Sequence, residues 1–166
     1  MAFETETGNG SATANSYLTV AAADTYFSDR SNTTWSAATN ATKEAALIKA
    51  TQYVDQAQAW KGTRANETQA LKWPRIGVYD EDEYYIAETT IPQCLKDCVC
   101  EFAVLVVGGT TLVTTYTKAV LKRRVEGAIS VEFDKSSPDG IRYDDLWLLV
   151  SGLTTGSSLC GINVRA

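Results

Sequence analysis

Three cysteines close together, Cys94, Cys98 and Cys100, are the first candidates for chemistry, because thiolates bind zinc and other soft metals. The segment that holds them has a helical pattern. On a helix, Cys94 and Cys98 share a face, whereas Cys100 points about 160° away from Cys98. Three thiolates placed in this way cannot converge on one ion, so we interpret them as small buried apolar residues.

The acidic run of residues 80–83, Asp-Glu-Asp-Glu, is the second candidate, because carboxylates bind calcium. An EF-hand loop also needs oxygen ligands at fixed spacing, a central glycine and a terminal glutamate, and this run lacks them. We therefore expect a solvated acidic loop. The sequence contains no histidine, which excludes Ser-His-Asp triads, Cys-His dyads and zinc sites that use histidine. No other nucleophile or phosphate-loop motif is present, so we predict no enzyme activity and no cofactor or metal.

Two further clusters are candidates for binding rather than catalysis. Lys118, Lys122, Arg123 and Arg124 could contact DNA phosphates, pair with an acidic protein partner, or form a solvated face. Tryptophan and arginine are frequent at interface hot spots, but a large aromatic ring beside a proline also often completes a core. Both alternatives stay open for the second cluster, which consists of Trp60, Lys61, Arg64, Trp73 and Arg75.

The charge of the chain limits its partners. The formal net charge is −5 and the isoelectric point is about 4.8. An acidic protein is a poor match for nucleic acid or an anionic membrane surface, since both attract cations. No run of about 18–20 apolar residues predicts a membrane span. The acidic first residues do not resemble a signal peptide, so we expect the protein to be made in a cytosol, where its four cysteines stay reduced.

The elements that must position these residues are mostly helices. Apolar residues at helical spacing and capping residues predict helices over 20–30, 42–59 and 92–107, a helical turn over 67–72, and a short last helix over 143–150. Residues 31–41 and 136–140 are typical of turns. β-branched and aromatic residues predict an extended hairpin or arm over 120–133.

The predicted fold class is therefore mainly α, a small helical bundle with an extended β-hairpin arm and flexible N- and C-terminal segments. We divide the chain into a flexible N-terminal segment (1–16), a helical core domain (17–117), an extended β arm (118–135), and a C-terminal short helix and tail (136–166). The first and last segments are rich in small polar residues, which favours loose structure.

Several motifs resemble one family. They are residues 14–20 (Ala-Asn-Ser-Tyr-Leu-Thr-Val), 23–27 (Ala-Asp-Thr-Tyr-Phe) with Trp35, 43–55 from Lys43 to Asp55, 61–64 (Lys-Gly-Thr-Arg) with 69–75 (Gln-Ala-Leu-Lys-Trp-Pro-Arg), and Ile91-Pro92 before a helix with Glu101. This set is similar to the head–tail connector (adaptor, or head completion) proteins of tailed phages, a type also labelled DnaT-like single-stranded-DNA-binding. Residues 121–133 resemble the extension of those connectors.

The resemblance implies a helical bundle in the virion neck, made in the host bacterial cytoplasm. It implies a homo-oligomeric ring of twelve copies that contacts the portal protein and a tail, stopper or tail-terminator protein. DNA would only pass through the channel as cargo, and no membrane would be involved. The candidate protein interface comprises Trp60, Lys61, Arg64, Trp73, Arg75, Lys122, Arg123, Arg124, Ile129, Val131 and Phe133.

Two hypotheses remain besides the connector. A replication accessory that binds single-stranded DNA would need a cationic groove with stacking aromatic side chains. The tryptophans are present, but a sustained basic track is not. An enzyme is the remote alternative, because no histidine and no other catalytic constellation is available.

Overall fold

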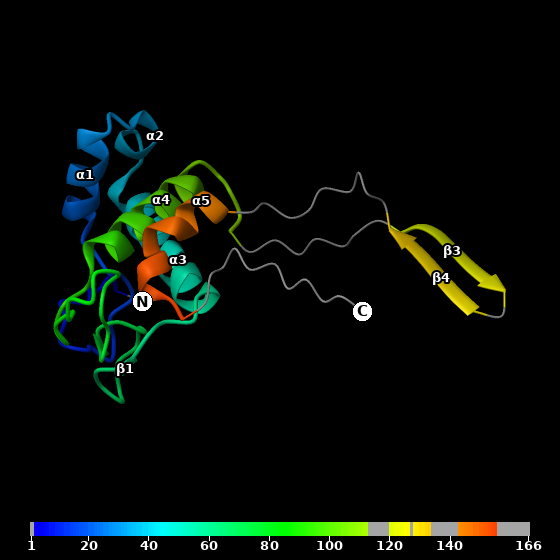
Figure 1. Cartoon of the computed structure of the whole chain (residues 1–166). Helices are drawn as coiled ribbons and strands as arrows, with labels where there is room; N and C mark the ends of the chain where they lie inside the picture. Colours follow the sequence, from blue (N-terminus) through cyan, green and yellow to red (C-terminus); the bar gives the residue numbers. More distant parts are fainter. Residues whose placement is uncertain (1, 113–119, 127, 134–142, 156–166) are drawn as a thin grey trace. The chain divides into compact units, whose positions relative to one another are not determined.

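The computed structural model describes residues 2–112, 120–126, 128–133 and 143–155 (Figure 1). The chain divides into two compact units, of which one spans Val113–Tyr143 and the other combines Met1–Leu112 with Asp144–Ala166. The larger unit is a helical core, and the smaller holds an antiparallel hairpin, so the predicted mainly α fold with a β-hairpin is confirmed. The four-part division by residue ranges stays a prediction.

The first two helices of the core are set by side-chain caps. Helix α1 (Val20–Asp29) follows Thr19, whose hydroxyl accepts a hydrogen bond from the backbone N–H of Ala22 at 3.1 Å. This confirms the predicted helix over 20–30. The predicted turn over 31–41 contains one more short helix, α2 (Thr33–Ser36). The side chain of Asn32 caps it, and α2 directs Trp35 into the core.

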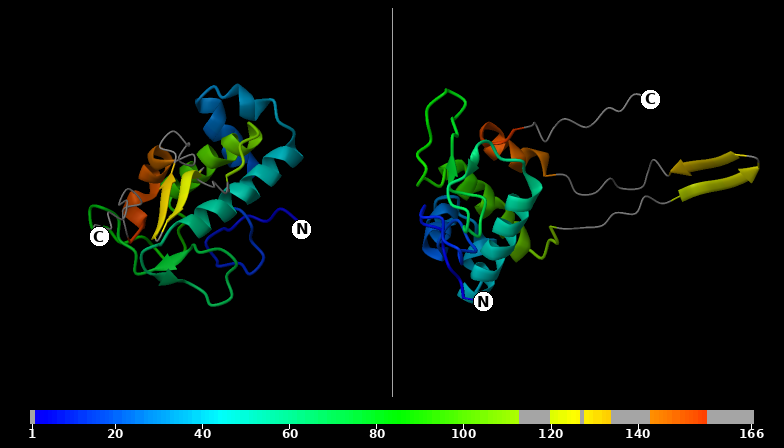
Figure 2. Two further views of the ribbon diagram at one scale, coloured as in Figure 1. Left: turned by 90° about the vertical axis from the view of Figure 1, so that its right-hand side faces the viewer. Right: turned by 90° about the horizontal axis from the view of Figure 1, so that it is seen from below.

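Helices α3 (Asn40–Ala57) and α4 (Gln93–Val107) pack against each other and form the centre of the core (Figure 2). Helix α3 begins two residues earlier than predicted because the Thr39 side chain caps it and accepts from the backbone N–H of Thr42. Helix α4 follows Pro92, as predicted, and ends at Gly108. The interior of this pair is apolar and fully excluded from solvent, with Leu47, Val54, Leu95, Val99 and Phe102.

The N-terminal segment, expected to be loose, is folded against the core. Thr5 and Ser16 form a parallel bridge. The buried carboxylate of Glu6 accepts hydrogen bonds from the backbone N–H groups of Gly8, Gly10 and Ser11 at 2.8–3.0 Å. The sequence pattern missed this ordering because small polar residues signal loops whether or not a buried acid satisfies their backbone.

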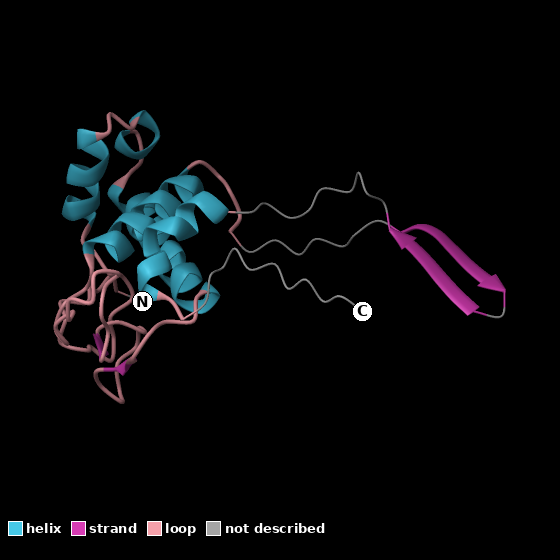
Figure 3. Cartoon of the chain, in the orientation of Figure 1, coloured by secondary structure: helices cyan, strands magenta, loops and turns pink. Residues whose placement is uncertain are grey.

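The loops of residues 2–18 and 58–91 gather on the lower side of the helices in Figure 3. Within them, β1 (Thr63–Arg64) pairs antiparallel with β2 (Arg75–Ile76). The predicted helical turn over 67–72 is wrong. Gln69 instead spans the loop, because its amide accepts from the N–H of Asn66 and donates to the carbonyls of Leu71 and Pro74.

The C-terminal part of the core is helical, as predicted for 143–150. Helix α5 (Asp144–Trp147) continues into the 3-10 helix η1 (Leu148–Leu153). The Trp147 ring lies 4.7 Å from that of Phe102, centroid to centroid. The backbone N–H of Lys61 donates to the carbonyl of Leu153 at 2.9 Å. This end of the chain is therefore tied to α4 and to the loop after α3.

The smaller unit contains the predicted hairpin. Strands β3 (Val120–Glu126) and β4 (Ala128–Phe133) pair antiparallel, with Arg123 opposite Val131 and Val125 opposite Ile129. Lys118, the predicted turn over 136–140, and residues 156–166 of the predicted tail, including Cys160, lie outside the described residues. Among the helices that the structure describes, none is long and apolar enough to cross a membrane.

Candidate functional site

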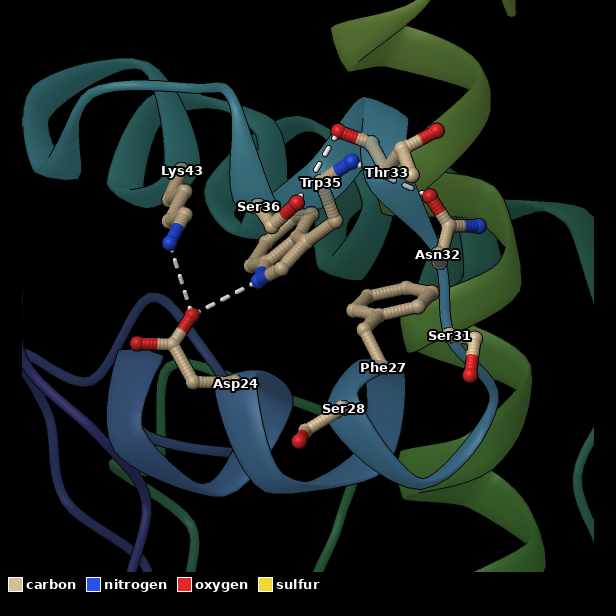
Figure 4. Close-up of a pocket in the computed structure, with 9 residues that line it drawn as sticks. All are labelled: Asp24, Phe27, Ser28, Ser31, Asn32, Thr33, Trp35, Ser36 and Lys43. Atoms are coloured by element: carbon tan, nitrogen blue, oxygen red, sulfur yellow. Dashed lines mark hydrogen bonds and ion pairs between the residues drawn. The ribbon is translucent and has the colours of Figure 1, made fainter.

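An open pocket of about 410 Å³ lies between α1, α2 and the start of α3 (Figure 4). Asp24 is one of the residues that line it. The Trp35 indole N–H and the Lys43 ammonium donate to the same Asp24 oxygen at 2.7 and 2.8 Å. The rings of Phe27 and Trp35 form the apolar side of the pocket, with their centroids 4.7 Å apart.

The two charged groups of this pocket, Asp24 and Lys43, pair with each other. Burial alone would raise the pKa of Asp24, but the hydrogen bonds from Lys43 and Trp35 and the Lys43 charge outweigh it, so this pKa lies below its ordinary value. Asp24 is thus held as a carboxylate with two donors and is a poor general base. The trio connects three helices, and we interpret it as a structural clamp.

A second polar cluster is buried beneath the loop of residues 60–75. The Tyr17 hydroxyl donates to one carboxylate oxygen of Asp55 and accepts from the backbone N–H of Trp73 at 3.1 Å. The other oxygen of Asp55 accepts from the Lys72 N–H at 2.9 Å. Burial raises the pKa of both Asp55 and Tyr17. The cluster joins the N-terminal segment, α3 and this loop, and Tyr17 and Asp55 are both more than nine-tenths buried.

The tryptophan and arginine cluster of the sequence does come together. Trp60 and Trp73 pack edge to face with centroids 6.0 Å apart, and both are buried. The Arg75 guanidinium is also buried and donates to the carbonyls of Lys61, Gly62 and Lys72 at 2.6–3.1 Å. This favours the core role over the anchor role for these three side chains. Their place in a protein interface stays a prediction.

Lys61 and Arg64 differ from the other members of that cluster. The Lys61 ammonium reaches the carbonyl of Gly152 at 2.6 Å and so fastens η1. Arg64 is exposed and donates to the carbonyl of Gln69 at 3.3 Å. It lines an open hollow of about 470 Å³ together with Lys72, Gln52, Gln56 and Asn15. No aromatic residue lines this hollow in the part of the chain that the structure describes.

The remaining predicted interface residues lie in the hairpin unit. Lys122, Arg123 and Arg124 are consecutive in β3, and Ile129, Val131 and Phe133 alternate along β4. The cross-strand register pairs Arg123 with Val131. Cationic and apolar positions therefore occur in one two-stranded segment, as expected for an interface, and their role in binding stays a prediction.

Sequence reasoning missed a groove of about 360 Å³ between the loop of residues 78–86 and η1, which we call the acidic groove. Its lining includes Asp80, Glu81 and Asp82 from that loop and Leu148 and Leu149 from η1. Both leucines are exposed, at 52% and 40% of their surface. The signal that could have found it was a pair of leucines on a short helix that also has to bury Trp147, Val150 and Leu153.

The acidic groove also borders the exposed tyrosines. Tyr79 and Tyr85 pair across a bridge with ring centroids 5.5 Å apart, and Tyr84 between them is 72% exposed. Aromatic rings, leucines and carboxylates thus share one loop-and-helix surface. Such a surface can bind apolar and cationic protein segments, and its carboxylates repel a polyanion.

The three cysteines of α4 are free thiols. Within the described residues, no group of three histidine, cysteine, aspartate or glutamate side chains could hold a metal ion. Cys98 and Cys100 are buried free thiols, and burial raises the pKa of each to about 12. At neutral pH they are protonated, which suits the role of small apolar residues.

Comparison with protein families matches the whole chain, residues 1–166, to the family described as "Putative DnaT-like ssDNA binding protein". The chain belongs to this family. The family description names binding and not catalysis, and it says nothing of a phage connector. No curated protein and no solved structure matches the chain.

The residues that prompted a family resemblance mostly turn out to be internal in this DnaT-like chain. Asp24, Trp35 and Lys43 form the clamp of the pocket, whereas Tyr17 and Asp55 form the buried cluster. These motifs are structural and specify the helical core. They identify the family, and some of their residues, among them Asn15, Arg64 and Lys72, also line the open hollow of about 470 Å³.

Proposed function

We propose that this chain is a virion structural protein, the head–tail connector (adaptor) of a tailed bacteriophage. In this role it forms a homo-oligomeric ring between the portal protein and a tail, stopper or tail-terminator protein, in the neck of the virion. DNA passes through the channel of the ring without being held. The chain acts through protein–protein contacts, with no catalytic step.

One observation carries the proposal: apart from Ile76, the large aromatic and apolar side chains exposed on the described core lie near carboxylates. Tyr79, Tyr84 and Tyr85 flank the acidic run of residues 80–83, and all four tryptophans are buried. A surface that stacks on bases would instead place exposed rings beside cations. In the described core, residues 2–112 and 143–155, acidic side chains outnumber basic ones two to one. This supports a protein partner over a nucleic acid.

The hairpin supports the same function. It forms a compact unit separate from the core, and an isolated two-stranded hairpin is marginally stable in water. A segment of this kind gains stability when it is covered by another protein surface. In a stepwise assembly, such a segment can become ordered when one subunit docks and can then form the binding surface for the next subunit.

The second candidate function is binding of single-stranded DNA, which the family description favours. Two features of the chain could serve it: the three consecutive cations of β3, and the hollow lined by Arg64 and Lys72. Three phosphate contacts on a single strand would give a slope of about −2 when log K is plotted against log salt concentration. That affinity is modest and strongly dependent on salt.

One pair of measurements separates the two functions. The first is fluorescence anisotropy of labelled single-stranded DNA with the purified protein at low and moderate salt, using wild type and Lys122→Ala/Arg123→Ala/Arg124→Ala. The matched control is Lys49→Ala, which removes an exposed cation from α3. Tight binding that the triple substitution abolishes and the control preserves supports the DNA-binding function.

The second measurement is electron microscopy of the protein alone and mixed with portal protein, together with immunogold labelling of virions. The connector function predicts rings on the portal, label at the neck, and weak DNA binding. Virions that lack the polypeptide, or label at any other position, would refute it.

A further inference from the structure

We propose that the acidic groove of one copy binds the β3–β4 hairpin of a second copy of this chain. This deepens the proposed function and rests on it, since it names the contact that joins neighbouring subunits. The proposal stands on the exposed apolar lining of the groove, on charge complementarity, and on the hairpin's need for a covering surface.

The groove has the composition of a docking site. Single exposed leucines are common on protein surfaces, but here Leu148 and Leu149 line one hollow with three carboxylates. Glu81 lies over Gly152, whose missing side chain leaves room, because a Cβ there would stand 2.9 Å from the Glu81 Cγ. The lining of the groove therefore combines apolar side chains with negative charge. It suits a segment that is both cationic and apolar.

The hairpin has the complementary composition. Its register places Arg123, Val125, Ile129 and Val131 at positions that share one face, because directly paired residues of antiparallel strands lie on the same side. The alternate positions hold Lys122 opposite Glu132, Arg124 opposite Ser130, and Glu126 opposite Ala128. One set of positions is thus mainly β-branched with a single arginine, the other is of mixed charge, and the two strands together carry three basic and two acidic residues. Two strands cannot cover such an apolar face by themselves.

A second copy is the occupant that the arrangement favours. The hairpin and the groove are different patches, and every copy has one of each, so the contact is heterologous and can repeat from copy to copy until a ring closes. DNA is a poor occupant of the groove, because phosphates would face Asp80, Glu81 and Asp82. A ring held in this way needs no other protein to form its contacts.

The test is photo-crosslinking between isotopically distinct copies of the full chain. p-Benzoylphenylalanine replaces Phe133 in unlabelled protein, which is mixed with nitrogen-15 protein that lacks the probe. Mass spectrometry then identifies each crosslinked peptide and assigns it to one copy or to two. We expect mixed-isotope crosslinks from position 133 to peptides that contain residues 80–82 or 148–153, with a yield that falls as salt rises.

Charge reversal gives the matched comparison. Asp80→Lys/Glu81→Lys/Asp82→Lys in the nitrogen-15 copy should lower the crosslink yield at least about tenfold, which corresponds to about 1.4 kcal/mol. Reversal of three acidic residues elsewhere on the core should leave the yield unchanged; this control is Asp29→Lys/Glu44→Lys/Glu67→Lys. A donor with Lys122→Glu/Arg123→Glu/Arg124→Glu should recover the yield with the reversed groove. Circular dichroism melting verifies that every variant is folded.

Several outcomes overturn the proposal: crosslinks confined to one chain, crosslinks to other surfaces, and a yield that the groove and control reversals change equally. Failure of the docking contact can be distinguished from failure of the connector function, because immunogold labelling at the virion neck tests the connector function separately. If the protein is found at the neck but its hairpin crosslinks to another surface, only the docking contact is refuted.

Discussion

Replacement of Tyr17 by phenylalanine tests whether the buried polar cluster holds the core together. The ring still fits, so the packing is retained and only the hydroxyl is lost. Two partners then lose a hydrogen bond: the Asp55 carboxylate, which accepts from this hydroxyl, and the backbone N–H of Trp73, which donates to it. A hydrogen bond to a charged group contributes about 1.5–3 kcal/mol, and an orphaned buried N–H costs about 1–3 kcal/mol. We expect a loss of about 3–5 kcal/mol in the free energy of unfolding.

Urea denaturation followed by tryptophan fluorescence measures this loss. With a denaturant slope of about 2 kcal/mol/M, the midpoint should fall by about 1.5–2.5 M. The matched control is Tyr26→Phe, because the Tyr26 hydroxyl donates only to Glu101, at 2.7 Å, and is half-buried. This control should cost about 1 kcal/mol.

The effect of Tyr17→Phe should also depend on pH. Burial raises the pKa of Asp55, while the Tyr17 hydrogen bond lowers it, so the substitution raises this pKa further. A raised pKa means that the native state gains stability as the pH falls and the carboxyl takes up its proton. The difference between variant and wild type should therefore narrow toward acid pH. Equal losses for Tyr17→Phe and Tyr26→Phe, or a difference that widens in acid, would refute the role of the cluster.

Three further predictions concern single residues. Gly62→Ala should lower the melting temperature more than Gly77→Ala. Both glycines have positive φ, at 68° and 72°, but a Cβ on Gly62 would stand 2.2 Å from the Ile76 carbonyl oxygen, whereas a Cβ on Gly77 would have no atom within 4 Å. Equal shifts in melting temperature would contradict the close approach at Gly62. Asp24→Asn should destabilise the protein at neutral pH and destabilise it less in acid, because the lowered pKa of Asp24 contributes stability that is lost when the carboxylate is protonated. Melting curves at several pH values check this. A difference in melting temperature between variant and wild type that stays constant with pH would count against it. Cys98, whose pKa burial raises to about 12, should react with a thiol reagent at pH 8 only after unfolding; rapid labelling of the native protein would show that it is accessible.

The sequence predicts the regular elements of the core well, because caps and apolar spacing act locally. Thr19 and Pro92 mark helix starts that the structure confirms. The structure of the loops is harder to predict from the sequence. Glu6 and Gln69 order their surroundings through hydrogen bonds to backbone groups nearby in the chain, but nothing in their residue type indicates that they are buried. Acidic and amide side chains usually face water, so their burial follows from the tertiary structure and not from pattern.

The candidate site also has a part that the sequence indicates and a part that it does not. The sequence pattern singles out Trp60, Trp73 and Arg75 but leaves open whether they complete a core or anchor a partner, because their burial depends on how the loop folds back. The acidic groove could not be predicted, because it needs η1 to return beside the loop of residues 78–86. About sixty residues, including the whole hairpin unit, separate that loop from η1 in the sequence. Long-range return of the chain is the part of a fold that local patterns do not encode.

The place of the hairpin in the chain has a mechanical consequence. It is an insertion between α4 and α5, two helices that pack on each other, and not a free end. Tension applied to the hairpin is therefore shared between both helices and pulls on their contact with the core at once. A terminal arm would let the core peel away one residue at a time. Two anchor points instead require the packed helices to yield together, so a subunit pulled by its arm should resist until the core fails cooperatively.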